Sequence, residues 1–228
     1  MKKFCQLLLI ITTFGLLLVI HFTSNACPQG PPDYIDQYWE GSETGSMPLS
    51  PTCTVYFHYC WRTVKDASGY VIFNDVCIWH FWLAGDCNGI DINPEHYRDI
   101  IEGCLGWLVA QTPNDWEMEI PDCSSNQSEQ VWRMMGPTCL TELYPKWEWV
   151  NGKQVIVLAA DICESPEHQG YCYCIYQYCW DKTNPLMPVL VPTVVECGKF
   201  TNNFSCVGWI ILDDGRRLEC HPTCREEK

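Results

Sequence analysis

Short runs rich in β-branched and aromatic residues recur along the chain and predict strands. One run spans residues 54–61, a polar turn follows at 65–69, and two further runs span 70–73 and 77–82. Val, Thr, Tyr, Phe and Trp suit the pleated, half-buried surface of a sheet, and a polar turn between two such runs is typical of a hairpin. The pattern therefore predicts antiparallel strands in the first half of the chain.

Two later segments predict further hairpins. Residues 147–150 and 153–158 flank Asn151-Gly152, which is the preferred pair for a two-residue hairpin turn. Near the C-terminus, apolar residues on both sides of Asp213-Asp214-Gly215 repeat this arrangement.

A helix is predicted after residue 93. Asn93 suits the N-cap, Pro94 the first helical position and Glu95 the first turn, and Pro113 ends the segment. Apolar residues then follow at helical spacing: Tyr97, Ile100, Ile101, Cys104, Leu105 and Leu108. A second short helix is predicted from 125 to 135, before Gly136-Pro137.

A cysteine pattern recurs after 119 residues. Cys53 and Cys60-Trp61 are spaced like Cys172 and Cys179-Trp180, and the cysteines that come next align approximately, Cys77 with Cys197 and Cys87 with Cys206. We interpret this as two related β modules, although coincidence in so cysteine-rich a chain is the alternative. The predicted organisation is an extended Pro/Gly/Ser-rich lead-in (27–52), a first module (53–104) with its helix to about 112, a helix and hairpin connector (113–171) and a second module (172–228).

The first 26 residues predict a secretory signal peptide. Lys2 and Lys3 precede an apolar stretch of 14 residues, 7–20, and Ser24 and Ala26 occupy the −3 and −1 positions of a cleavage site. The stretch is shorter than the ~20 residues of a membrane-spanning helix, so an uncleaved anchor is the weaker alternative. Lipidation of Cys27 is another alternative, but Ser24 stands where a lipoprotein signal usually has leucine.

Cysteine parity favours complete pairing of the mature chain. Of 17 cysteines, Cys5 leaves with the signal, and the even remainder can pair fully in an oxidising compartment. The predicted disulfide cysteines are Cys27, Cys53, Cys60, Cys77, Cys87, Cys104, Cys123, Cys139, Cys163, Cys172, Cys174, Cys179, Cys197, Cys206, Cys220 and Cys224.

Strand geometry restricts which cysteines can pair. Seven residues along a strand place Cys53 and Cys60 on opposite faces and ~23 Å apart, beyond disulfide reach. These two cysteines, and likewise Cys172 and Cys179, should therefore bond other elements. Cys172 and Cys174 share a face.

The net charge excludes several partners. Removal of Lys2 and Lys3 leaves 12 basic against 28 acidic residues, a net charge of −16. This field repels nucleic acid and disfavours anionic membranes. No second long apolar run follows the signal, so no membrane span is expected after cleavage. Extracellular proteins and glycans remain as partners.

Calcium is one candidate ligand. Residues 85–93 resemble the calcium loop of EF-hand and dockerin modules, with Asp86, Asn88 and Asp91 close to a helix start. The acids are out of phase, because Ile90 occupies the fifth position and Tyr97 the twelfth. A polar turn before the helix explains the same residues, and we predict no obligatory cofactor.

Zinc and hydrolase chemistry are weaker candidates. The sequences Cys220-His221-Pro-Thr-Cys224 and Cys172-Tyr-Cys174 have ligand-like spacing, but disulfides are favoured outside the cell. The usual hydrolase motifs are absent. His58 and His80, in aromatic strands, are interpreted as structural, and the acid pair Glu117 and Glu119 fits a glycosidase only weakly.

Aromatic residues give the best binding candidates. We expect most tryptophans to pack in the core, among them Trp61, Trp79, Trp82 and Trp180. Trp147 and Trp149 flank Glu148 on a hairpin arm, so they share a face and are predicted to form an exposed binding pair. Asn126 and Asn203 begin glycosylation sequons.

Together these patterns predict a secreted, disulfide-rich, mainly β protein, in which two related small antiparallel β modules flank a helical insertion. The leading functional hypothesis is a non-catalytic binding or structural role outside the cell, directed at a protein or a glycan. A secreted hydrolase acting on glycans or peptides and a calcium-dependent adhesion module are the alternatives.

Overall fold

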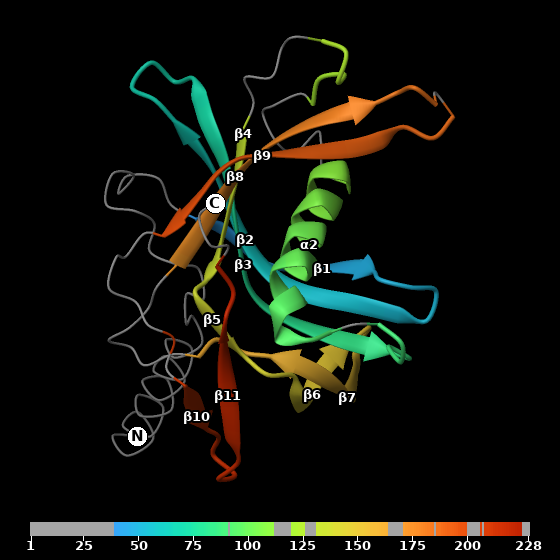
Figure 1. The fold of residues 1–228 in the computed structure, drawn as a ribbon, viewed down its shortest axis with the longest axis vertical. Helices are drawn as coiled ribbons and strands as arrows, with labels where there is room; N and C mark the ends of the chain where they lie inside the picture. Colours follow the sequence, from blue (N-terminus) through green and yellow to red (C-terminus); the bar gives the residue numbers. More distant parts are fainter. Residues whose placement is uncertain are drawn as a thin grey trace, which may run out of the picture.

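The computed structural model describes residues 39–90, 92–111, 120–125, 131–163, 171–184, 186–199, 206 and 208–224. This part of the chain is mainly strand, with one long helix (Figure 1). None of its helices is long and apolar enough to cross a membrane.

A branched eight-stranded sheet forms most of the protein. Its main path runs β1-β2-β3-β4-β8-β9, and β7 pairs with both β3 and β6. The strands are β1 (Glu40–Pro48), β2 (Cys53–Lys65), β3 (Val71–Gly85), β4 (Val131–Pro137), β6 (Tyr144–Val150), β7 (Lys153–Ala160), β8 (Tyr171–Asp181) and β9 (Val189–Lys199).

The sheet branches along β3. Residues 74–77 of β3 pair in parallel with β4, and residues 81–83 pair antiparallel with β7. All along its other edge β3 pairs with β2, with a bulge that leaves Trp79 unmatched beside His80. Two strands therefore leave β3 in succession, and His80 lies between them.

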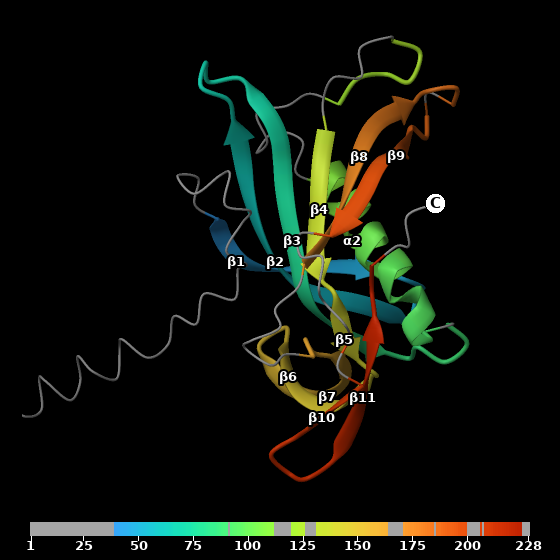
Figure 2. The same cartoon turned by 60° about the vertical axis from the view of Figure 1, so that its left-hand side comes forward.

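A smaller sheet lies at one end of the molecule. It has the order β10-β11-β5, with β5 spanning Cys139–Thr141, β10 Trp209–Ile211 and β11 Arg217–Pro222. Figure 2 shows the β10–β11 hairpin at the opposite end from the diverging β2–β3 and β8–β9 hairpins.

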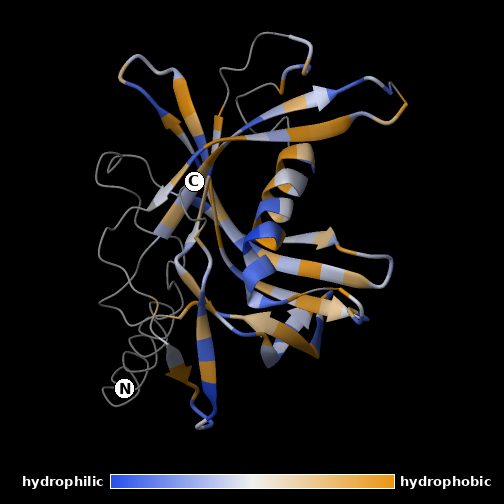
Figure 3. Ribbon diagram, viewed as in Figure 1, coloured by the Kyte–Doolittle hydropathy of each residue, from blue (hydrophilic) through white to orange (hydrophobic). Residues whose placement is uncertain are grey.

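Helix α2 makes the connection that the parallel β3–β4 pair requires. Parallel neighbours need a crossover, most often a helix. Here a 3₁₀ turn, η2 (Pro94–His96), leads into α2 (Tyr97–Gln111), which covers one face of the sheet (Figure 1). Each residue that the helical spacing predicted to be apolar-facing is buried, including Cys104 and Leu105. Figure 3 shows hydrophobic residues along this helix and the adjoining strands.

The two faces of β2 and β3 differ in chemistry. Val55, Phe57 and Phe81 face α2 in the main core. On the opposite face, cross-strand pairs follow one another along the strands and differ in chemistry from pair to pair. They are Arg62 with Asp75, Cys60 with Cys77, His58 with His80, and Tyr56 with Trp82. Asp75 accepts hydrogen bonds there from Arg62 and from Arg133 of β4, at 2.7–2.9 Å, in a buried ion-pair triad.

The prediction of a helix at 125–135 is wrong. Residues 126–130 lie outside the described part, and residues 131–135 belong to strand β4. Residues 131–135 are a strand because β4 hydrogen-bonds β3 on one edge and β8 on the other. Tertiary pairing thus overrides the local helical pattern.

The second half of the predicted extended lead-in forms a strand, because residues 40–48 pair as β1 with the edge of β2. The run Glu40–Pro48 lacks the apolar alternation that predicts a strand. Backbone hydrogen bonds to β2 hold this strand, together with the hydrogen bond from the Tyr59 hydroxyl to Glu43, and Gly45 lies directly against the ring of Phe57.

The two segments of the cysteine repeat form hairpins of a single sheet, β2–β3 and β8–β9. Their cysteines do not occupy matching registers: Cys60 lies opposite Cys77, whereas Cys179 lies opposite Val191. That the segments are related modules stays a prediction.

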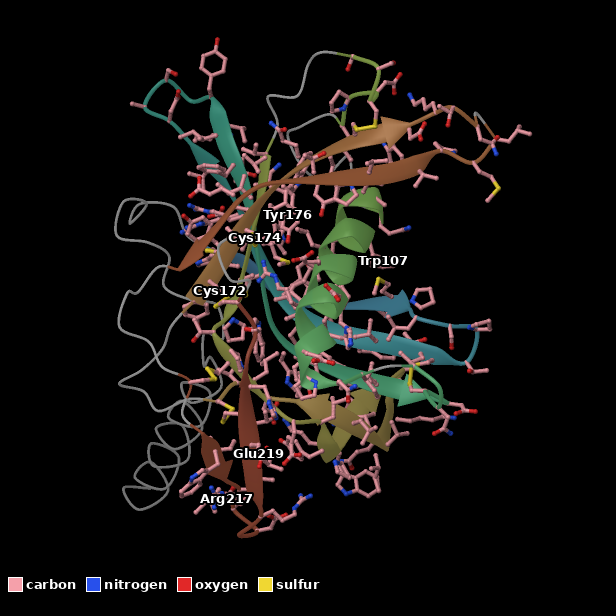
Figure 4. All side chains as sticks on the ribbon, viewed as in Figure 1. Trp107, Cys172, Cys174, Tyr176, Arg217 and Glu219 are labelled. Carbon is pink, nitrogen blue, oxygen red and sulfur yellow. A yellow bond between two sulfur atoms is a disulfide. The ribbon has the colours of Figure 1, made fainter. Side chains whose placement is uncertain are left out.

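Six disulfides join described residues. They connect Cys53–Cys87, Cys123–Cys179, Cys139–Cys206, Cys163–Cys220, Cys172–Cys224 and Cys174–Cys197. Cys60 is also disulfide-bonded, and Cys27 lies outside the described residues. The predicted outward bridging is confirmed, and Figure 4 shows Cys172 and Cys174 close together on β8.

The prediction that all sixteen cysteines after the signal form disulfides is wrong, since Cys77 and Cys104 are free buried thiols. Cys104 belongs to α2 and faces the main core, whereas Cys77 lies on the face of β3 that points away from α2. Because the two thiols belong to opposite faces of the sheet, they cannot bond each other.

We expect both free thiols to resist alkylation in the native protein. Burial raises the pKa of each, so the reactive thiolate is scarce, and the surrounding side chains exclude the reagent. Iodoacetamide labelling followed by peptide mass spectrometry should modify Cys77 and Cys104 only in denaturant. Rapid native labelling of either would contradict their burial.

We expect Gly45→Ala to lower the free energy of unfolding by about 1–3 kcal/mol. A Cβ at this position would overlap the buried ring of Phe57. Gly208→Ala is the matched control, because a Cβ at Gly208 meets open space. Urea unfolding of both variants measures the difference, and equal midpoints would contradict the close packing of β1 on β2.

Candidate functional site

The β6–β7 hairpin presents one face to solvent. Its turn has Asn151 at φ 51° and Gly152 at φ 75°, as the Asn-Gly turn predicts. Side chains alternate in exposure along both strands. We call the outward set the aromatic face: Pro145, Trp147, Trp149, Gln154, Ile156 and Leu158.

Large apolar side chains dominate the aromatic face. Trp147 is 60% exposed, Trp149 67% and Ile156 62%. Trp147 and Ile156 are direct cross-strand partners, so their side chains lie together. The prediction that Trp147 and Trp149 are exposed on one face of the hairpin is confirmed.

A groove of about 610 Å³ adjoins the aromatic face. It lies where the hairpin diverges from the end of β3, next to the loop that leads toward the helix. Three residues of the aromatic face, Pro145, Ile156 and Leu158, also line this groove, opposite Leu83 and Ile92. The exposed tryptophans and the groove therefore belong to one mainly apolar surface.

The inner face of the hairpin is anchored by ion pairs. His80 of β3 lies 2.6 Å from Asp161 through Nδ1 and 3.6 Å from Glu148 through Nε2. The Lys146 ammonium lies 2.9 Å from Asp161 and 3.4 Å from Glu148, and the Tyr144 hydroxyl donates to Asp161. We call these five residues the His80 cluster.

Electrostatics favour the charged forms of His80, Asp161 and Glu148. Burial alone would lower the pKa of His80, but hydrogen bonds to Asp161 and Glu148 outweigh burial and raise it. Burial likewise opposes ionisation of Asp161, yet the hydrogen bond from His80 holds its pKa far below the usual range. The same histidine lowers the pKa of Glu148.

His58 continues the cluster onto β2 in its neutral form. Its ring stacks on that of His80 at 5.5 Å and on that of Trp79 at 5.1 Å, and Nδ1 lies 3.0 Å from the Thr44 hydroxyl. Burial, and then the charge of His80, lowers the pKa of His58. Both histidines therefore contact other side chains of the protein, and their structural interpretation stays a prediction.

The cluster contains its own cation. The Lys146 ammonium contacts both carboxylates and balances part of their negative charge. Across the residues that the structure covers, no group of three or more His, Cys, Asp and Glu side chains is arranged to hold a metal.

The calcium-like loop uses its polar atoms internally. Asp86 Oδ1 accepts hydrogen bonds from the backbone and side-chain amides of Asn88, and Cys87 bonds Cys53. Asp91 lies outside the described residues. Calcium binding stays a prediction that no contact here supports.

The zinc alternative is wrong for its cysteines. Cys172, Cys174, Cys220 and Cys224 are all consumed in disulfides. The acid pair Glu117 and Glu119 of the hydrolase alternative, and the sequons at Asn126 and Asn203, lie outside the described residues.

The other tryptophan candidates are more enclosed. Trp82 is fully buried, while Trp61, Trp79 and Trp180 are half-buried in their strands. Sequence reasoning missed the His80 cluster. The one local signal was the alternation of Lys146 and Glu148 with the tryptophans, which marks a strand with one polar face.

No protein-family model matches this chain, and no curated protein or solved structure does either.

We expect Asp161→Asn to lower the free energy of unfolding by about 2 kcal/mol, because it leaves His80 and Lys146 without their main anion. The pKa of His80, followed by NMR of its ring protons, should fall. Asp99→Asn is the control, since Asp99 lies 3.5 Å from His96 in an exposed pair. An unchanged His80 titration in Asp161→Asn would contradict the cluster.

Proposed function

We propose that this protein is a secreted binding protein whose ligand-contacting surface is the aromatic face of the β6–β7 hairpin with its adjoining groove. The observation that carries the proposal is the exposure of Trp147, Trp149 and Ile156 on one hairpin face. Apolar patches of this kind on soluble proteins mark interaction sites, and tryptophan is enriched among the residues that dominate binding energy.

A protein partner fits this surface better than a glycan. Sugar hydroxyls need hydrogen-bonding partners when they lose water. Gln154 is the only polar side chain within the six-residue aromatic face, whereas Pro145, Ile156 and Leu158 add aliphatic area. A core of aromatic and aliphatic groups is the composition of protein interfaces.

The chemistry of the His80 cluster supports binding over catalysis. Asp161 already accepts hydrogen bonds from His80, Lys146 and Tyr144, so its oxygens are engaged within the protein. These groups fix the hairpin that carries the tryptophans. The disulfides and the predicted signal peptide support a location outside the cell.

The proposal is tested with a peptide library displayed on phage and panned against the mature chain. Selected peptides should lose at least about 30-fold in affinity when Trp147 and Trp149 are both changed to Ala. Trp209→Ala is the matched control, because Trp209 is 42% exposed on β10, in the other sheet. Its affinity should stay within about twofold of wild type.

Two results would count against this function. Peptides that bind the double variant as tightly as wild type would show that the aromatic face is not the contact surface. A glycan array that yields tryptophan-dependent binding, while no peptide is selected, would replace the protein partner with a carbohydrate.

A further inference from the structure

The hairpin is joined to the sheet by a short stretch of backbone. Three register pairs connect β7 with β3, at residues 81–83, and the rest of β6–β7 extends beyond them. Main-chain hydrogen bonds over so few residues leave the angle of a hairpin weakly specified. Side-chain contacts between β3 and the hairpin therefore take a large share in fixing it.

Trp82 of β3 packs with Val157 and Ala159 of β7, and His80 makes the polar contacts from the branch of the sheet. One ring nitrogen lies 2.6 Å from Asp161, just after β7, and the other 3.6 Å from Glu148 in β6. A single imidazole thus holds both strands of the hairpin against β3. It is 4% exposed, so water cannot readily replace these contacts.

Charge balance in the cluster depends on one proton. With His80 protonated, the cations His80 and Lys146 match the anions Asp161 and Glu148. When His80 is neutral, the cluster carries one net negative charge, which Lys146 alone does not balance. A net charge in a half-buried space is unfavourable, and opening of the hairpin to solvent would relieve it.

Groups on every neighbouring element face this imidazole or its partners. β2 contributes neutral His58, β6 contributes Tyr144, Lys146 and Glu148, and Asp161 follows β7. From β1, the backbone of Glu43 hydrogen-bonds His58, and Arg216 of the β10–β11 turn lies 5.8 Å from the Tyr144 ring. Among these, only the two histidines have ordinary pKa values near neutrality.

We propose that His80 is a proton-operated clamp, which holds the aromatic hairpin in one fixed position when protonated and releases it when neutral. The clamp rests on the proposed function for its biological meaning, since the hairpin carries the binding surface. A binding face that is fixed in position loses less entropy on binding than a mobile one. Affinity for the partner is therefore highest on the acidic side of neutrality.

The direction of the pH dependence follows from linkage. A histidine whose pKa is raised in the folded state adds stability that is complete below its unfolded pKa and is lost as pH rises through the folded one. Asp161 and Glu148, whose pKa values are lowered, lose their contribution only in acid, below about pH 4. Above the ordinary histidine pKa of about 6.5, His58 with its lowered pKa stays neutral, and His80 is the group of the cluster that titrates.

Hydrogen exchange of the ligand-free mature chain tests the clamp directly. Protection factors of β6 and β7 amides, corrected for the intrinsic pH dependence of exchange, should fall at least about threefold between pH 6 and 8.5. In His80→Asn this fall should disappear, because asparagine keeps a donor toward Asp161 but does not titrate. His96→Asn, at an exposed histidine, is the control and should retain the wild-type profile.

A second variant keeps the test informative if His80→Asn fails to fold. Lys146 lowers the pKa of His80 by charge repulsion. Lys146→Gln should therefore move the loss of protection to higher pH, and an unchanged or lower midpoint would overturn the clamp. A His80 ring that titrates below pH 6.5 in NMR of the wild-type chain would also overturn it.

These readouts need no partner, so the two proposals fail separately. A pH-independent hairpin with tryptophan-dependent peptide binding would leave the function standing and remove the clamp. A pH-dependent hairpin whose tryptophans do not affect binding would do the reverse.

Discussion

Strand β3 imposes the constraint on which the other elements depend. Its backbone hydrogen-bonds β2 along one edge, and β4 and then β7 in succession along the other. Because β4 runs parallel to β3, the intervening chain must return past the sheet, and α2 makes that return while covering the core. Residues 78–80 of β3 lie between the segment that pairs with β4 and the segment that pairs with β7. The imidazole of His80 contacts Glu148 and Asp161 at this point.

The column of residues on the face away from α2 shows how the protein buries polar groups. Asp75 is fully buried between Arg62 and Arg133, whose guanidinium groups also lie over the rings of Trp39 and Phe73. Such triads add little net stability but are costly to break. They fix the register of β2, β3 and β4, and so hold the branch of the sheet at a set position.

Local patterns in the sequence were enough to predict the strands around residues 54–82, helix α2, and the hairpin turns at 65–69, 151–152 and 213–215. They also predicted the exposed pair Trp147 and Trp149, since two bulky residues on one strand face need only the twofold period. Strand β4 was missed because its neighbours, not its own residues, decide its conformation. The His80 cluster was missed because His80 lies 68 positions before Glu148 and 81 before Asp161 in the sequence, and these residues meet only where β3 branches.

The C-terminal disulfides have a consequence for the order in which the chain can fold. Cys139–Cys206, Cys163–Cys220 and Cys172–Cys224 span 52 to 67 residues, and each closes through the last part of the described chain. Strand β5 likewise pairs with β11, which follows it by more than 70 residues. The smaller sheet therefore cannot assemble on the ribosome as its first strand emerges. Its completion must wait until β11 has been synthesised, and its disulfides need an oxidant to form.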